Sequence, residues 1–566
     1  MKRKSKWLPA IIVALICYAL FSVTGKIYAD NDNLMIGVVT SGEYSNDVYC
    51  QYLHPLLCLI IYGLSFIFPT ADCFLVITSL FVMIEFSVLT YISLLEAGDK
   101  PLKQWEIQDY IFRIMLICGI VFLSTAINLW SINYTAQTAS FVFAGMIGIF
   151  VSQKHEKQEV LYILGIALIV MGFMMRIEAA LIFIPYIILV GISEVFSSSD
   201  RRQKAEAIIK VLSPGIIIVV ALLISRSVFW SIEPHASSWK YNEVRTITGD
   251  FAMKKWTDVA GVIENTDKTE YDSPIVWSIF DTDVLNTEKL TYIAEIGSIS
   301  RYPLSGEGLM KTLAEMKRRL VATNLQLLLL FVVTALVAIR NLVCLKNRIY
   351  KYETLLAILG SFIILFYFTF RGRAPLRVWQ SVLFAALAVM ILAVVHDQAE
   401  HLDTKNTLFM LGISIVLYFS IGQVIATGEL HAPETAFTAR INVDESEYDQ
   451  TLEEDSLFIW PSFWQTLAGK YVEKGKMPSR QVLEHNIPLA YWSYGQVYFN
   501  DMLDRIGAPN PAKALLERSN TYLVRDPGMD KFVLEYMQAH YGDDLSLEEA
   551  GEVNGYKYFR LVREGA

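Results

Sequence analysis

Runs of apolar residues recur along most of this 566-residue chain, and they constrain its fold more than any other feature. Several runs reach about 20 residues, the length that a helix needs to cross the hydrocarbon core of a bilayer. Hydrophobic residues make up 54% of the chain and the mean hydropathy is +0.39, more than a soluble domain of this size needs. The sequence therefore predicts a mainly α protein, a polytopic bundle of transmembrane helices.

The basic residues between the apolar runs set the expected topology. Lys2, Arg3 and Lys4 precede the first run, and positively charged residues stay on the cytoplasmic side of a membrane. Applied along the chain, this rule predicts about 11 spans, with the N-terminus in the cytoplasm and the C-terminus outside. The expected spans are residues 7–28, 73–95, 110–129, 136–151, 160–175, 179–192, 208–228, 320–339, 355–370, 378–395 and 407–425.

The apolar run from His54 to Phe68 is an exception, because it is short and is followed by Pro69. A run of this length is typical of a helix that lies along the membrane interface. We therefore expect it to rest on the outer surface without spanning, with His54 facing the lipid headgroups.

Two parts of the chain are expected from this pattern. Residues 1–428 are predicted to form the transmembrane domain, with a first outer loop at 29–71 and a long outer loop at 229–319. Residues 429–566 are predicted to form a small extracytoplasmic α/β domain, with strands at 456–460, 521–525 and 556–560 and a helix at 531–541. This tail carries 23 acids against 13 bases in a chain of net charge −9, so nucleic acid is not an expected partner.

Three weaker motifs carry alternatives. The six cysteines form no Cys-x-x-Cys pair, so neither a zinc site nor a disulfide scaffold is indicated. Asp281-Thr282-Asp283 is compatible with a divalent metal, but a helix cap or turn is the commoner use of such a pair. An aromatic stretch is compatible with sugar stacking, although packing in a small core is the commoner role; its members are Trp460, Trp464, Tyr491, Trp492 and Tyr494.

Ionisable residues gather in three clusters on the outer side of this topology. These clusters are Asp30, Asp32, Glu43 and Asp47; Arg176 and Glu178; and Arg371, Arg373 and Arg377. Charges at the membrane boundary are costly unless they are paired or used. One chemistry uses both signs: a carboxylate deprotonates an acceptor hydroxyl, while guanidinium groups hold a phosphate leaving group. Solvated loop acids and arginines that bind lipid headgroups are the alternative.

The first outer loop resembles that of the GT-C class of membrane glycosyltransferases, and in particular of bacterial multispan members with the pattern Asn-Asp-Asp-x-x-Met, Ser-Gly-x-Tyr and His/Asn-Pro. Residues 30–35, 41–44 and 54–55 carry the match, and Arg176 and residues 373–378 also resemble this family. The resemblance implies a polyprenyl-phosphate sugar donor, an inverting single displacement and a first-loop acid as base. One position departs from the pattern: the first acid of the family's pair is Asn31 here, which bears on any role that needs two adjacent carboxylates, including metal binding.

We therefore expect a glycosyltransferase of the bacterial cell membrane that moves a sugar from a polyprenyl-phosphate donor to an envelope glycan or lipid-linked acceptor on the outer face. The expected catalytic acids are Asp32, then Asp47 and Glu43. The expected donor-phosphate ligands are Arg373, Arg377, Arg371 and Arg176. The expected supporting residues are Asp30, His54 and Glu178. No cofactor and no metal ligand is assigned, although a divalent metal is compatible with this chemistry.

Two other functions share part of this pattern. A glycan polymerase or ligase also uses outward loops and a lipid-linked substrate. A transporter or flippase usually has internal repeats and polar residues in the middle of its spans. Here no repeat is evident and the charges cluster at the span ends, which favours an enzyme.

Overall fold

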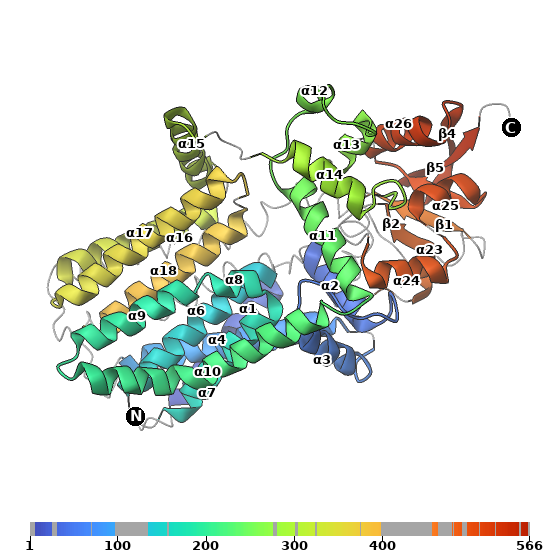
Figure 1. Ribbon diagram of the computed structural model, residues 1–566. Coiled ribbons are helices and arrows are strands. Elements are labelled where there is room, and N and C mark those ends of the chain that lie inside the picture. The colour runs from blue at the N-terminus through green and yellow to red at the C-terminus, as the bar shows by residue number, and fades with distance from the viewer. Residues whose placement is uncertain are drawn as a thin grey trace.

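The structure is a computed structural model, and it describes residues 6–24, 31–69, 71–96, 134–155, 158–275, 280–299, 304–322, 325–373, 375–397, 456–461, 478, 480–489, 495–508, 510–526, 528–553 and 556–563. A bundle of long helices makes up one part. Shorter outer helices and a sheet domain lie together at one end of that bundle (Figure 1).

The bundle helices match the predicted spans where the structure describes them. They are α1 (Trp7–Thr24), α4 (Cys73–Glu96), α6 (Tyr134–Lys154), α7 (Glu159–Met175), α8 (Ile177–Leu181), α9 (Ile184–Ser197), α10 (Arg201–Phe229), α16 (Leu325–Cys344), α17 (Arg348–Phe370) and α18 (Leu376–His396). Within the described residues, 6 segments are long and apolar enough to cross a membrane: α4, α6, α8 with α9, α10, α17 and α18. The chain is therefore a multi-pass membrane protein. The total of 11 spans stays a prediction, because residues 110–129 and 407–425 lie outside the described residues. The helices at three other expected spans, α1, α7 and α16, are not among these 6 segments.

Helix α6 lies at the centre of the bundle, and its most apolar 18-residue window is 100% buried. Glycines let its neighbour α7 approach closely. A Cβ atom on Gly145 would lie 2.6 Å from the carbonyl oxygen of Gly165, whereas one on Gly148 would make only ordinary contacts, at 3.5 Å or more. Small residues at a crossing point are a common means of packing membrane helices, since lipid gives little hydrophobic drive between them.

Helix α3 (Pro55–Ser65) corresponds to the short apolar run of the first loop. Its 11 residues rise about 17 Å, well short of a hydrocarbon core of about 30 Å. Leu56 and Leu59 remain 48% and 46% exposed, as an interfacial helix requires, whereas Leu57 and Ile61 are buried.

His54 does not face the headgroups as expected. It is 4% exposed, its Nδ1 accepts from the Leu56 N–H at 3.1 Å, and its Nε2 lies 3.0 Å from the Leu222 oxygen. Its side chain is turned inward because it caps α3 and ties that helix to α10. Burial lowers the pKa of His54, which is consistent with a neutral ring in this position.

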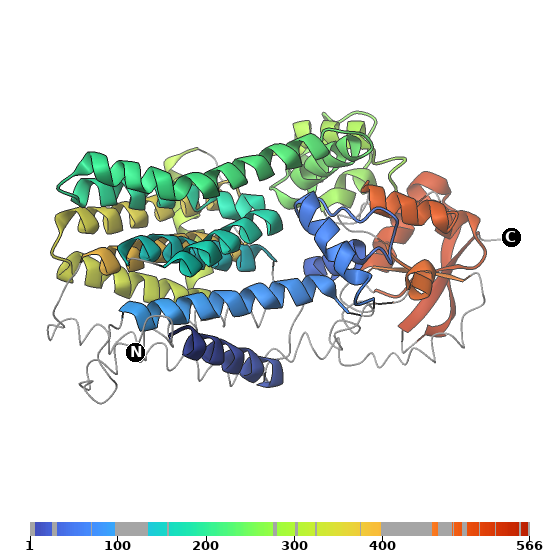
Figure 2. The ribbon, with the colours of Figure 1, turned by 90° about the horizontal axis from the view of Figure 1, so that it is seen from below.

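The outer helices come from the two predicted loops. They are α2 (Asn31–Ser41), α11 (His235–Asp250), α12 (Trp256–Val259), α13 (Lys268–Ile275), α14 (Thr287–Gly297) and α15 (Gly306–Ala322). Helix α11 leaves the end of α10 and passes toward the sheet domain, beside α14 (Figures 1 and 2).

The C-terminal part is a mixed sheet with helices, as predicted for an α/β domain. Its described strands are ordered β2-β1-β3-β5-β4, with β1 parallel to both β2 and β3, and β5 antiparallel to both β3 and β4. Strands β1 (Leu457–Trp460), β3 (Thr521–Val524) and β5 (Tyr556–Arg563) and helix α26 (Met529–Tyr541) coincide with expected elements. The further elements are α23 (Arg480–His485), β2 (Asn486–Pro488), α24 (Val497–Arg505), α25 (Pro511–Glu517) and β4 (Leu545–Val553).

Hydrogen bonds hold the sheet domain against both outer loops. Asp281 is 0% exposed, and its Oδ2 accepts from the Tyr541 hydroxyl at 2.5 Å and the Tyr536 hydroxyl at 3.3 Å. Its neighbour in the motif, Asp283, forms an ion pair with Lys513 of α25. The two acids of the Asp-x-Asp motif therefore join the long loop to the sheet domain. Asp281 Oδ1 also accepts from the Val284 N–H at 3.4 Å, in agreement with the turn interpretation of this motif.

Trp460 belongs to the core of the sheet domain. It is 3% exposed and its Nε1 donates to Asn486 Oδ1 at 2.7 Å. This agrees with the packing interpretation for that residue. The other four aromatic residues of the stretch lie outside the described residues.

Candidate functional site

Arg176 lies at the break between α7 and α8, at the bundle end that carries the outer helices. Its backbone is extended there, with φ −154° and ψ 95°. Its Nη1 donates to the Tyr134 hydroxyl at 2.6 Å, its Nε lies 2.9 Å from Glu178 Oε2, and its guanidinium stands 4.6 Å from the centre of the Tyr52 ring. Three partners from different segments thus fix the direction of this guanidinium.

Arg373 lies in the turn between α17 and α18. The turn is tight because Gly372 adopts φ 82°, a conformation that glycine takes at little cost. Arg373 Nη2 donates to Asp250 Oδ2 at 2.6 Å, and the guanidinium stands 4.9 Å from the centre of the Phe251 ring. The guanidinium of Arg371 stands 6.0 Å from the centre of the same ring.

The arginines from these two segments lie close enough to act on one another. Burial lowers the pKa of Arg373; the Asp250 charge opposes this, while the positive charges of Arg176 and Arg377 lower it further. We call Arg176, Arg371, Arg373 and Arg377 the arginine cluster. A concentration of guanidinium groups favours binding of a phosphate.

Glu178 pairs with two arginines at this end of the bundle. Its Oε1 lies 3.3 Å from Nη2 of Arg226, while its Oε2 pairs with Arg176. Arg226 is 8% exposed and its Nη2 also donates to the Gln51 oxygen at 3.2 Å. Arg226 was not predicted as a site residue, since it lies inside the apolar run of α10 and looks like part of a span.

Asp32 lies in the first turn of α2, and a hydrogen-bonded path leads from that turn to the arginine cluster. The Oδ1 of the next residue, Asn33, accepts from the Tyr134 N–H at 3.1 Å. The hydroxyl of the same tyrosine accepts from Arg176 Nη1. One tyrosine therefore separates Asn33 from Arg176, so the start of α2 is adjacent to the cluster. Asp30 lies outside the described residues.

Asp47 lies farther along the first loop, against the start of α11. Its Oδ1 accepts from the Tyr49 N–H at 3.2 Å; its Oδ2 lies 4.0 Å from His235 Nδ1 and makes no hydrogen bond. Burial raises the pKa of Asp47 to about 6. The hydrogen bond from Tyr49 lowers this pKa, and the negative charge of Asp501 raises it. Glu43 is half-buried in the same loop, and its N–H donates to Ser41 Oγ at 3.2 Å.

Helix α11 links the surroundings of Asp47 to those of Arg373. It begins at His235, beside Asp47, and ends at Asp250, which pairs with Arg373. Sixteen residues of α-helix span about 22 Å between the first and last Cα atoms. Asp47 therefore lies at the end of α11 away from Asp250 and Arg373, while Tyr52 of the same loop contacts Arg176.

A group of side chains with the spacing of a metal site lies elsewhere. In the described part of the chain, one group has the right spacing: Asp267, Glu270 and His540, whose ligand atoms all lie within 4.8 Å of one another. This group joins α13 to α26, outside the arginine cluster. Lys289 Nζ lies 2.6 Å from Glu270 Oε2 and already supplies a positive charge.

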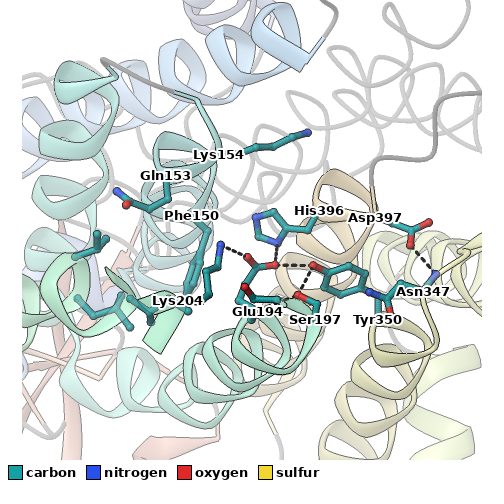
Figure 3. A pocket seen from close by; sticks show the side chains of 14 residues that line it. Phe150, Gln153, Lys154, Glu194, Ser197, Lys204, Asn347, Tyr350, His396 and Asp397 are labelled. Atoms are coloured by element: carbon teal, nitrogen blue, oxygen red, sulfur yellow. Dashed lines mark hydrogen bonds and ion pairs between the residues drawn. The ribbon is translucent and has the colours of Figure 1, made fainter. Parts of the chain in front are cut away.

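The residues expected on the cytoplasmic side meet at a second polar site. Lys154, Lys204, Asn347 and His396 line one cavity of about 480 Å³ (Figure 3). At its centre, Glu194 lies 2.7 Å from both Lys204 Nζ and His396 Nδ1. These residues come from separate loops with one predicted orientation, and the structure places them together at one end.

Comparison with known proteins gave the following. No family model matches the sequence, and no curated protein matches it. Two crystal structures of the Archaeoglobus fulgidus oligosaccharyltransferase resemble the structure. One is tethered to an acceptor peptide that contains an NVT sequon, with TM-score 0.42, 11% identity and coverage of 97% of this chain and 74% of that one. The other is a complex with Zn and sulfate, with TM-score 0.41, 12% identity and coverage of 97% and 72%. A likeness of this degree assigns no activity.

Proposed function

We propose that the protein is a membrane glycosyltransferase of the inverting GT-C type. It moves a sugar from a polyprenyl-phosphate donor to a cell-envelope glycan or lipid-linked acceptor on the outer face of the bacterial cell membrane. The observation that carries this proposal is the arginine cluster, which two segments far apart in the sequence build at one end of a membrane-embedded bundle, beside the turn that contains Asp32.

The arginines are suited to the donor phosphate. Arg373, Arg377 and Arg176 stay charged at every physiological pH and offer forked N–H donors, which match phosphate oxygens better than an ammonium group does. Glu178 orients Arg176, because its Oε2 lies 2.9 Å from the Nε. Negative charge builds up on the phosphate as it leaves, so fixed positive charges stabilise the transition state more than the ground state.

Asp32 is the proposed general base. It takes the proton of an acceptor hydroxyl, whose oxygen forms a bond to the anomeric carbon as the bond from that carbon to the phosphate oxygen breaks. Polyprenyl phosphate leaves with the electron pair, and the anomeric configuration inverts. A base must lie within hydrogen-bond reach of the attacking hydroxyl, or one water away, which favours an acid beside the cluster.

The test is a transfer assay with purified protein and a panel of polyprenyl-phosphate sugars. Donor affinity and turnover are measured separately for the wild type, Asp32→Asn, Asp47→Asn and Arg377→Gln. We expect Asp32→Asn to lower turnover about 10²- to 10³-fold with donor affinity nearly intact, and Arg377→Gln to weaken donor affinity as well. Asp47→Asn is an identical change at the alternative base in the same loop, and it should keep its turnover if Asp32 is the base. Full turnover in Asp32→Asn refutes the assignment of the base.

A further inference from the structure

Asp250 has one carboxylate oxygen that the fold does not use. Its Oδ2 accepts from Arg373 Nη2 at 2.6 Å, whereas its Oδ1 is buried and makes no hydrogen bond. The side chain is 13% exposed. A buried acceptor without a donor costs free energy, so such an atom in a native structure requires an explanation.

The position of this oxygen indicates which ligand would donate a hydrogen bond to it. Asp250 is the last residue of α11, and the Phe251 ring that follows lies under Arg373 and Arg371. Its Oδ1 therefore belongs to the same carboxylate as the oxygen that accepts from Arg373, a member of the arginine cluster. A ligand whose phosphate sits on Arg373 and which carries an O–H or N–H donor next to that phosphate can satisfy Oδ1 in the same binding event.

We propose that Asp250 binds the sugar of the donor, by accepting a hydrogen bond from the group on carbon 2. This inference rests on the proposed function and names the substrate more closely. Carbon 2 is bonded to the anomeric carbon that carries the phosphate, so its substituent is the sugar donor group nearest to the arginines. A hydroxyl or an acetamido N–H at that position fits Oδ1. Asp250 thus binds the sugar, while Arg373, with which it pairs, binds the phosphate.

The variant Asp250→Asn separates these two roles. Because Arg373 donates a hydrogen bond, the amide of the new residue turns its oxygen toward Arg373 and places its NH2 where Oδ1 was. The contact with Arg373 is kept in neutral form, and the acceptor for the sugar is replaced by a donor. Asp258→Asn is the matched control, since Asp258 is an exposed acid of the same outer loop.

Binding of two kinds of ligand to the full-length protein in detergent then gives the readout. The first is polyprenyl phosphate, which has no sugar, and the second is a set of its glucosyl, galactosyl, mannosyl and N-acetylglucosaminyl esters. We expect Asp250→Asn to weaken the best sugar donor about tenfold more than it weakens polyprenyl phosphate, the loss typical of a hydrogen bond to a charged group. Arg373→Gln should weaken both ligands by similar factors, because it removes phosphate binding.

A 2-deoxy donor tests the same bond from the side of the ligand, on wild-type protein whose fold is unchanged. It should lose about tenfold in affinity on the wild type and lose nothing further on Asp250→Asn. Equal weakening of both ligands by Asp250→Asn, or full affinity of the 2-deoxy donor, overturns the inference and leaves Asp250 as a residue that only positions Arg373. If Asp250→Asn does not fold, the 2-deoxy comparison on the wild type decides. Failure of the wild type to bind any donor refutes the proposed function itself, and the inference with it.

Discussion

Replacing Asp47 with asparagine is expected to stabilise the protein at neutral pH. Burial raises the pKa of Asp47 from 3.8 to about 6, so its ionised form costs free energy in the folded chain. A shift of one pKa unit corresponds to about 1.4 kcal/mol, which sets an upper bound of about 3 kcal/mol. The side chain is 11% exposed, so solvent screening lowers the expected gain to between about 1 and 3 kcal/mol.

The pH dependence of this gain has a definite sign. From about pH 4 to about pH 6 the folded chain keeps a proton on Asp47 that the unfolded chain has released, so the stability of the wild type falls as the pH rises through this window. The amide of the Asp47→Asn variant cannot titrate, and its oxygen still accepts from the Tyr49 N–H. The difference in stability between variant and wild type should therefore grow from about pH 4 and reach its full size above about pH 6.

Thermal unfolding in detergent, followed by tryptophan fluorescence across this pH range, measures the effect. The control is Asp258→Asn, the same change at an exposed acid, which should shift the transition little at any pH. A lower transition temperature for Asp47→Asn at neutral pH would refute the reasoning. So would a gain that does not vary with pH, because it would show that the carboxyl charge is not its source.

Three further outcomes are expected. Gly145→Ala should destabilise the bundle, since its Cβ would lie 2.6 Å from the Gly165 oxygen, whereas Gly148→Ala should be tolerated; the yield of monodisperse protein in size-exclusion chromatography compares them. Asp281→Ala should lower the free energy of unfolding by about 2–4 kcal/mol, because two tyrosine hydroxyls lose a buried acceptor, and Asp281→Asn should lower it less; thermal unfolding measures both. Arg505→Gln should speed proteolysis of the first loop, because Arg505 Nη2 donates to the Tyr44 oxygen at 2.6 Å; an unchanged digestion pattern would contradict this.

The bundle was predictable because its signal is physical and local. Runs such as 73–95 and 378–395 follow from the cost of apolar surface in water and of polar backbone in lipid, and α4 and α18 coincide with them. Strand β2 was not predicted, since a three-residue strand leaves no alternating pattern. Strand β4 contains Glu548, Glu549 and Glu552, which look like an exposed loop until its antiparallel pairing with β5 is known.

The candidate site was predictable only in part. The outer arginines stood out because they break the rule that keeps basic residues in the cytoplasm, and the structure brings Arg176, Arg373 and Arg377 together. Asp250 gave no such signal, because one acid in a polar loop looks like any other. Its partner Arg373 lies 123 positions away in the sequence, and only the fold brings the two together. The place of Asp47 was equally hidden, since nothing local indicates that it packs against the start of α11.

Helix α11 also bears on how a substrate would be recognised. Near its start, Ser238 Oγ donates to the Gly495 oxygen of the sheet domain at 2.7 Å, while its last residue holds Arg373. Under the proposed function, groups that the sheet domain touches through this helix lie about 20 Å from the bond that breaks. Binding energy gained at such a distance acts on the remote part of a long acceptor and not on the reacting atoms. A short acceptor that reaches only the arginine end would forgo that energy, so the length of the glycan, and not only its terminal sugar, would govern the rate of transfer at limiting substrate.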